Sequence, residues 1–247
     1  MASRAFPRMT LKILGEEISA QAEVPGPLGR LDEVLPLLLE LDQQSIELAV
    51  RNLPTGKQVS CTKGCSACCR AQPVPITPPE AYALMRLIEA LPEEQRYALE
   101  QKFSEHEAAL KQADILGLFL RENPIQDAKQ AREAVEAYIR LKLVCPFLVE
   151  DSCSIHPQRP FVCRQYLVTS DPSLCNDPLH EPVEVVSMPL RPAHAMLQVT
   201  EHFLHVSTGT IPLVLALAYV RKWRSQLEKA LPIKQVIETW IQSVAAS

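Results

Sequence analysis

Apolar residues recur every three or four positions along most of the chain, which is the spacing that places them on one face of an α-helix. A single stretch, VEVVSM at 183–188, has the composition of a strand. Strands and helices therefore do not alternate, which argues against a barrel or a doubly wound sheet. The predicted helices cover residues 31–53, 77–91, 92–123, 127–143, 193–206, 211–231 and the final VIETWIQSV.

Local signals set some of the expected boundaries. Thr77 can cap the helix that follows it, Pro78 suits the first helical position, and Glu80 completes a capping box. Gly117 is expected to weaken the long helix of residues 92–123. The sequence thus predicts a mainly α fold, with one helical domain wrapped around cysteine-bearing loops that form a metal site. Its expected organisation is a single domain, 1–247, with a metal-binding core at 61–175 and helical flanks at 1–60 and 176–247.

Composition narrows the classes of function. The 247 residues are enough to bury a core without covalent cross-links, and a net charge of −4 gives no strong signal for nucleic-acid binding. The most apolar run, at 211–220, has about half the length of a membrane span, so we expect a buried helix and no transmembrane segment. No secretion signal is recognisable, which favours a soluble, cytoplasmic protein. No phosphate-binding glycine loop or G-x-S-x-G motif supports a kinase, NTPase, Rossmann or hydrolase function.

The cysteines fall into two groups of four. In a reducing compartment, clustered cysteines more often bind metal or carry out redox chemistry than form lasting disulfides. A disulfide framework is the alternative if the protein is exported, and a catalytic pair of Cys153 and His156 is a further one. The candidate metal ligands are Cys61, Cys65, Cys68 and Cys69 in the first group and Cys145, Cys153, Cys163 and Cys175 in the second.

The first group, CTKGCSACC, requires a bend. In a continuous helix Cys61 and Cys68 would lie ~10 Å apart along the axis, too far for two ligands of one zinc ion with ~2.3 Å bonds. Gly64 can adopt positive φ, so we expect a loop there and a helix that begins near Cys68. The adjacent Cys68 and Cys69 are expected to point in different directions. One of them would then serve a second site or bind together with the downstream group.

The second group is framed by prolines, which restrict the loops beside each thiol. Pro160 is predicted to open a short helix that carries Cys163, where the helix dipole favours a thiolate. Arg159 and Arg164 are candidates to offset the charge of a four-thiolate site as surrounding hydrogen-bond donors. His156 lies between cysteines and is either a loop residue near the site or a substitute ligand.

The combination of CTKGCSACC, CPFL and CSIHPQRPFVCRQY resembles the YkgJ-type cysteine-cluster family. That family is named for a C-x-x-C-x-x-C-C pattern and is described as zinc- or iron-chelating, often as iron-sulfur proteins. The resemblance spans residues 61–175 and implies that the cysteines, with Arg159, Pro160 and Arg164, are signature positions. Three residues rather than two separate Cys61 from Cys65, which leaves the identity of the metal open.

These observations predict a metal-binding protein that holds an iron-sulfur cluster (such as 4Fe-4S) or zinc through its two cysteine groups, with an electron-transfer or redox role. An enzyme is the alternative, because the C-x3-C-x2-C of Cys61, Cys65 and Cys68 is similar to the radical S-adenosylmethionine signature. Some flagellin lysine methylases also resemble this family, which implies methyl transfer. A third alternative is a zinc-stabilised scaffold for a protein partner. The sequence assigns no catalytic residue and no specific partner.

Overall fold

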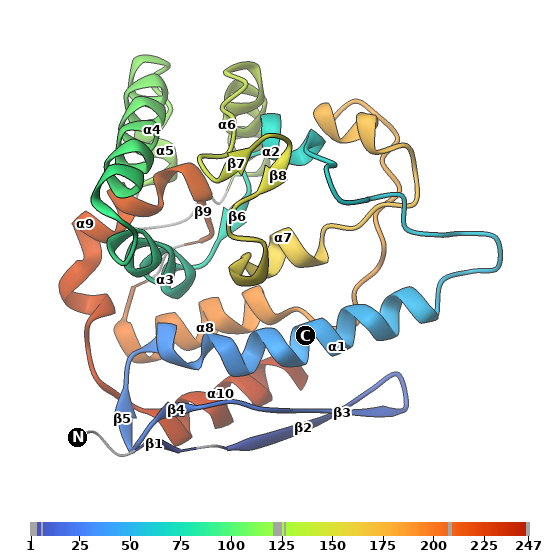
Figure 1. The fold of residues 1–247 in the computed structure, drawn as a ribbon, viewed down its shortest axis with the longest axis vertical. Coiled ribbons are helices and arrows are strands. Elements are labelled where there is room, and N and C mark those ends of the chain that lie inside the picture. The colour runs from blue at the N-terminus through green and yellow to red at the C-terminus, as the bar shows by residue number, and fades with distance from the viewer. Residues whose placement is uncertain (1–3, 6, 121–124, 126, 207–208, 246–247) are drawn as a thin grey trace.

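The computed structural model describes residues 4–5, 7–120, 125, 127–206 and 209–245, and it is mainly helical, as predicted (Figure 1). Most of the longer helices lie where the apolar spacing places them. They are α1 (Leu35–Arg51), α3 (Pro78–Glu89), α4 (Glu93–Gln112), α6 (Ala128–Arg140), α8 (Pro192–Leu204), α9 (Ala216–Leu227) and α10 (Ile233–Ala245). Shorter segments are α2 (Ala67–Ala71), α5 (Leu116–Phe119), α7 (Phe161–Gln165) and the 3-10 turns η1 (Leu31–Val34), η2 (His156–Gln158), η3 (Pro172–Asn176) and η4 (Leu213–Leu215).

Helix α1 crosses the middle of the molecule, and its apolar residues supply much of the main core (Figure 1). Leu37, Leu38 and Leu41 are fully buried. Around them α3 packs against α9, and α10 packs against α8. Trp240 of α10 is also fully buried, and its indole N–H points to the Pro192 carbonyl at 3.4 Å. Burial of this apolar surface is the main stabilising contribution to this part of the fold.

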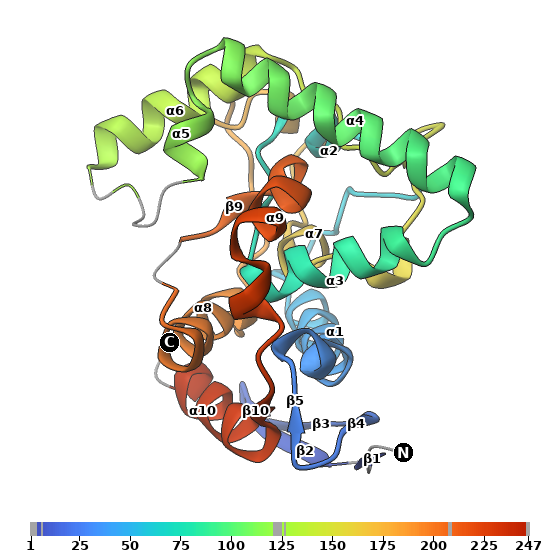
Figure 2. The same ribbon diagram turned by 90° about the vertical axis from the view of Figure 1, so that its left-hand side faces the viewer.

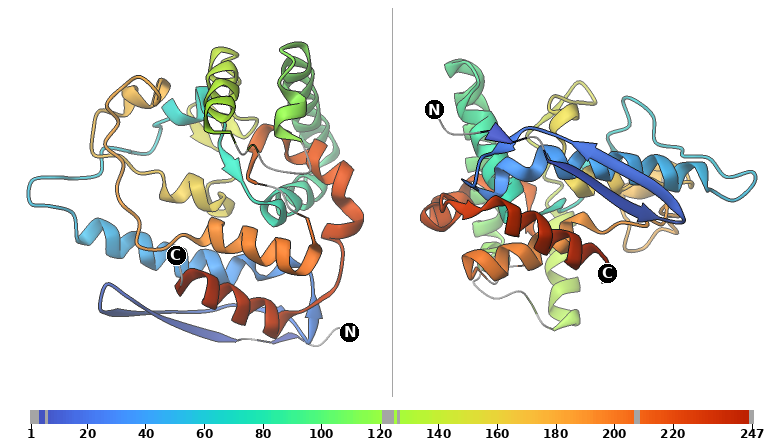
Figure 3. Two further views of the ribbon diagram at one scale, coloured as in Figure 1. Left: turned by 180° about the vertical axis from the view of Figure 1, so that it is seen from behind. Right: turned by 90° about the horizontal axis from the view of Figure 1, so that it is seen from below.

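The N-terminal flank is not wholly helical, which corrects the prediction for residues 1–60. Strands β2 (Arg8–Ile13) and β3 (Glu16–Gln21) form an antiparallel hairpin that packs against α1 (Figure 3). Its two-residue turn is Leu14-Gly15, with φ of 50° and 85°, as a tight hairpin turn requires. Met9 faces Ala20 across the ladder, and both side chains are buried. Side chains in this hairpin alternate between its two faces with a period of two, a signal that the prediction of helices did not use.

The remaining strands of the described residues form only two-stranded antiparallel pairs. The predicted strand at 183–188 is wrong, since it contributes a single bridge between Val185 and Val168. Pro182 and Pro189 border this stretch and cannot donate backbone hydrogen bonds to a ladder. The pairs are β1 (Arg4–Ala5) with β4 (Val24–Pro25), β5 (Leu28–Gly29) with β10 (Leu231–Pro232), β6 (Pro75–Ile76) with β9 (Ile211–Pro212), and β7 (Leu148–Val149) with β8 (Ser152–Cys153).

The long helix predicted for residues 92–123 breaks earlier than expected. Helix α4 ends at Gln112, Asp114 has a left-handed φ of 57°, and Gly117 lies inside the short α5. The break lets Ile115 join a second apolar cluster with Leu110 and Tyr138. Residues 121–123 of the predicted helix lie outside the described residues. Helices α4, α5 and α6 form the end of the molecule opposite the hairpin (Figure 2).

The most apolar run, residues 211–220, is buried as expected but is not one helix. It comprises β9, η4 and the start of α9, and every residue except Leu217 is classed as buried. Across the described ranges, none of the helices combines the length and the apolar character needed to cross a membrane.

Candidate metal centre

The first cysteine group bends at Gly64, as predicted. Gly64 has a φ of 89°, and the Cys65 N–H donates to the Thr62 carbonyl at 3.0 Å, which closes a turn. Helix α2 then begins at Ala67 and carries Cys68 and Cys69. The loop and the helix start therefore follow from the glycine position and the ligand-distance argument.

The expectation that Cys68 and Cys69 point apart is wrong. Their Sγ atoms lie 4.0 Å from each other. Rotation about χ1 brings the short side chains together although their Cα positions differ by about 100° around the helix.

The second group begins with a hairpin that lies against α2. The Cys145 N–H donates to the Cys69 carbonyl at 2.7 Å, and this bond joins the two groups directly. Strands β7 and β8 follow, with Leu148 opposite Cys153. Cys145 therefore lies just before the first strand of this hairpin, and Cys153 lies on the second strand.

A polar cluster fastens the tip of this hairpin to α2. The Ser66 hydroxyl donates to Asp151 at 2.6 Å, and Arg70 donates to the Ser66 Oγ at 3.0 Å and forms an ion pair with Asp151. The Ser66 hydrogen bond and then the Arg70 charge lower the pKa of the Asp151 carboxyl. Sequence reasoning missed this cluster, because its residues are far apart along the chain.

Cys163 lies on the short helix α7, which starts after Pro160 as predicted. Cys175 lies on η3 and is only 3% exposed. The Gln72 side chain, just beyond α2, donates to the Cys175 carbonyl at 2.7 Å. Both of the later cysteines are thus attached to elements that pack near α1 or α2.

Burial and local hydrogen bonding give the thiols different pKa values. Burial raises the pKa of Cys145 to about 12 and raises that of Cys163 well above its usual range. The hydrogen bond from Cys68, followed by the charges of Arg159 and Arg70, lowers the pKa of Cys69 to about 7. The same hydrogen bond raises the pKa of Cys68. The charges of Arg159 and Arg70 thus favour the thiolate of Cys69, the form that binds metals.

The three predicted surrounding residues all lie beside the second group. Arg164 donates to the Arg159 carbonyl at 2.9 Å and to the Pro157 carbonyl, so it braces the loop before α7. Burial raises the pKa of Cys153, and the charge of Arg159 partly counteracts this rise and helps to lower the pKa of Cys69. The buried Nε of Arg159 has no partner within the described part of the chain. The positive charge of Arg159 is the main cause of the lowered pKa of His156. Their role toward a metal stays a prediction.

Arg159 also lines a cavity of about 500 Å³ between α1, α3 and the loop before α7. Leu39 and Leu84 form part of its apolar wall. The same arginine thus interacts electrostatically with the thiols and borders an apolar cavity.

Two buried carboxyl groups attach α7 to the helices. Glu80 accepts hydrogen bonds from the N–H and hydroxyl of Thr77 and from the Phe161 N–H, each at 2.7 Å. The capping box is therefore confirmed, whereas the bond to Phe161 was not foreseen. Asp42 of α1 accepts from Gln165 at 2.7 Å. These bonds hold the helix that carries Cys163 at a fixed place on the core.

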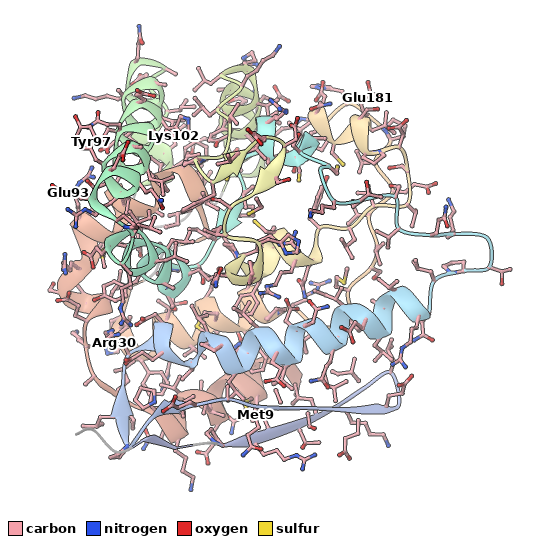
Figure 4. All side chains as sticks on the ribbon, in the orientation of Figure 1. Met9, Arg30, Glu93, Tyr97, Lys102 and Glu181 are labelled. Carbon is pink, nitrogen blue, oxygen red and sulfur yellow. The ribbon has the colours of Figure 1, made fainter. Side chains whose placement is uncertain are left out.

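Hydrogen bonds from α4 complete the surroundings of the second group. Lys102, labelled on α4 in Figure 4, donates to the Pro146 carbonyl at 3.4 Å. Its charge partly counteracts the burial that raises the pKa of Cys145. Lys102 thus links α4 to Pro146, the residue that follows Cys145.

The donor set fits zinc or iron. All eight cysteines are free thiols, so the disulfide alternative has no support in the structure. Zinc and iron-sulfur clusters both accept four cysteine thiolates. In the described residues, however, no three His, Cys, Asp or Glu side chains converge tightly enough to hold a metal ion. The fold gathers the cysteines into one region, but the described residues do not display a finished coordination site.

A sequence model of a known protein family matches residues 60–180, almost half of the chain. The family is CxxCxxCC, with the description "Putative zinc- or iron-chelating domain". This segment matches the CxxCxxCC family. The CxxCxxCC segment contains all eight cysteines and the three predicted surrounding residues, so the resemblance seen in the motifs is confirmed. No curated protein and no solved structure matches the chain.

Proposed function

We propose that this protein binds zinc or iron through the cysteine thiolates of its CxxCxxCC segment. The observation that carries the proposal is the joining of the two cysteine groups, which are far apart in sequence. The Cys145 N–H donates to the Cys69 carbonyl, and Gln72 attaches Cys175 beside α2. Eight thiols brought together from two segments are typical of metal ligands rather than of isolated buried cysteines.

The energetics of the buried thiols support the same function. Cys145 and Cys163 are poorly placed to ionise by themselves, because burial raises their pKa values. A bound zinc or iron ion would supply the positive charge that lets such thiols lose their protons. Arg159 and Arg70 add positive charge at Cys69. Metal binding should therefore release protons and should weaken at low pH.

An iron-sulfur cluster with an electron-transfer role is the finer form of the proposal. Its support is an all-thiol donor set in which Cys145, Cys153 and Cys163 pack against the main core. Burial and hydrogen bonding around cluster sulfurs are the factors that set reduction potential. Zinc bound by the same thiolates would instead have a structural role, as in the scaffold alternative.

The deciding experiment is the iron, zinc and acid-labile sulfide content of the full chain purified without oxygen, together with its absorption spectrum. Iron with sulfide and a broad band at about 400 nm would support the cluster. Colourless protein with stoichiometric zinc would support the structural role of zinc. Protein with neither metal, and with eight thiols that react freely in the native state, would overturn the proposal.

Single substitutions connect the metal to particular residues. Cys65→Ser and Cys163→Ser should each lower the metal content and the order of the surrounding loop together. Ser154→Ala, in the same second segment, is the matched control and should keep the metal content of the wild type. Full metal content in both cysteine variants would contradict their assignment as ligands.

A further inference from the structure

The thiols do not associate in the order in which they occur in the sequence. Cys145, Cys153 and Cys163, all from the second sequence group, pack against the main core. Cys69 comes from the first group, yet its carbonyl accepts the Cys145 N–H at 2.7 Å. Cys69 therefore lies beside cysteines of the second group.

The backbone supports this association. The β7–β8 hairpin keeps Cys145 and Cys153 near each other, because Cys145 precedes β7 and Cys153 lies on β8. Helix α7, which carries Cys163, is fixed to α3 through the Glu80 to Phe161 hydrogen bond. We call Cys69, Cys145, Cys153 and Cys163 the inner quartet, because three of them pack against the main core.

The other four cysteines lie on the loop through Gly64, on α2 and on η3. The Gln72 side chain, just beyond α2, donates to the Cys175 carbonyl at 2.7 Å. Ser60 fastens the start of the first loop to the segment that leads into η3, since its N–H donates to the Val168 carbonyl at 2.9 Å and its hydroxyl contacts the Ser170 carbonyl at 2.5 Å. Helix α2 packs on η3. We call Cys61, Cys65, Cys68 and Cys175 the outer quartet.

We propose that the eight cysteines form two adjoining four-thiolate metal sites, the inner quartet and the outer quartet, and that each site combines ligands from both sequence groups. This inference rests on the proposed function and goes beyond it by assigning the ligands. The two sites meet at Cys68 and Cys69, whose Sγ atoms are 4.0 Å apart. The adjacent pair supplies one ligand to each site, which explains why two neighbouring cysteines are useful.

The two sites differ in their surroundings. The inner quartet lies against the main core and near Arg159. In the outer quartet, Cys61 and Cys65 lie on the loop through Gly64 and are not among the residues that pack against the main core. A chelator should therefore reach the outer site before the inner one.

The first test uses pairs of substitutions in the full chain, with metal per chain measured after anaerobic purification. Cys61→Ser with Cys175→Ser should remove about half of the metal, no more than either single variant, because both residues serve one site. Cys61→Ser with Cys145→Ser should remove nearly all of it. Cys61→Ser with Cys69→Ser should also remove nearly all of it if the quartets are interleaved, but only half if each sequence group forms its own site. The last result would overturn the inference.

A second test avoids variants that fail to fold. The wild-type protein is treated with a limiting amount of chelator and then with iodoacetamide, and the modified cysteines are identified by peptide mass spectrometry. Cys61, Cys65, Cys68 and Cys175 should become reactive together while the inner quartet stays protected. Simultaneous modification of Cys61, Cys65, Cys68 and Cys69 would contradict the assignment of cysteines to the two quartets.

The outcomes separate this inference from the proposed function. If every single cysteine variant loses all metal, the thiols form one polynuclear site, and the two-site inference is wrong while metal binding stands. If the wild-type protein holds no metal under any condition, the proposed function itself fails. Thr62→Ser, between two outer ligands, serves as the control and should keep full metal content.

Discussion

The helical frame and the cysteine loops of this protein are held together in different ways. The frame, which we define as α1, α3, α8, α9 and α10, buries long apolar side chains such as Leu38 and Trp240 completely. The cysteine loops, residues 60–72 and 145–176, contain only short helices and a two-residue β-ladder. Their order comes from individual hydrogen bonds and from thiols gathered at one place. The comparison indicates that apolar burial stabilises the frame, whereas under the proposed function the loops depend on cross-linking by metal.

Removal of the metal should have the largest effect, and it should be confined to the loops. Structural zinc contributes about 10–16 kcal/mol to the folding of small zinc-finger peptides, because such sites are not formed without the ion. We expect hydrogen exchange and proteolysis to increase in residues 60–72 and 145–176 after chelation, while the helical circular dichroism of the frame persists. Global unfolding on chelation would show that the frame is not independent.

The substitution Trp240→Ala should give the next largest effect, and it should act on the frame. Replacing a fully buried tryptophan leaves a cavity and costs about 3–5 kcal/mol. Urea unfolding should show this loss, while metal per folded chain stays unchanged. Lys234→Ala on the exposed face of the same helix is the control and should change stability very little. Metal loss in folded Trp240→Ala protein would show that the frame and the cysteine loops form one cooperative unit.

The substitution Asp42→Asn should make stability less dependent on pH. Burial raises the pKa of Asp42 to about 7, and its Oδ2 has no partner in the described residues. The neutral acid is therefore favoured in the fold, and its contribution is lost as the pH rises from the unfolded pKa of about 4 to about 7. The asparagine variant should be more stable than wild type at pH 8, by up to about 4 kcal/mol at ~1.4 kcal/mol for each pKa unit, and similar to it at pH 4.

Urea unfolding at the two pH values measures this effect. Gln165 should keep its hydrogen bond to the asparagine side chain oxygen, so the link from α1 to α7 is preserved. An equal loss of stability at both pH values would mean that the ionised carboxylate is needed.

The substitution Gly64→Ala should have the smallest effect, and it should act on the loops. Its φ of 89° disfavours alanine by about 1 kcal/mol, and no atom lies within 4 Å of the added Cβ. We expect slightly weaker metal retention in a chelator titration. Gly117→Ala is the matched control, because it also meets no atom within 4 Å but lies in α5 without positive φ. An equal effect in both variants would argue against strain at Gly64.

Much of the local structure could be predicted from short-range chemistry. The Thr77 to Glu80 capping box, the bend at Gly64 and the helix start after Pro160 each depend on residues within a few positions of one another. The β2–β3 hairpin was missed although its alternating residues and the Leu14-Gly15 turn carry a local signal. The break at Asp114 had no such local signal. It accompanies tertiary packing, since Ile115 and the distant Tyr138 belong to the same apolar cluster.

By itself the sequence determined that this is a mainly helical protein with a thiol-rich segment of the CxxCxxCC family, because helical spacing and ligand chemistry are properties of neighbouring residues. Only the tertiary structure decided which cysteines lie together. The contact between Cys69 and Cys145 and the attachment of Cys175 beside Gln72 depend on hydrogen bonds across long stretches of chain. Spacing in a sequence sets how far two residues can be apart, but the packing of the intervening helices sets how close they come.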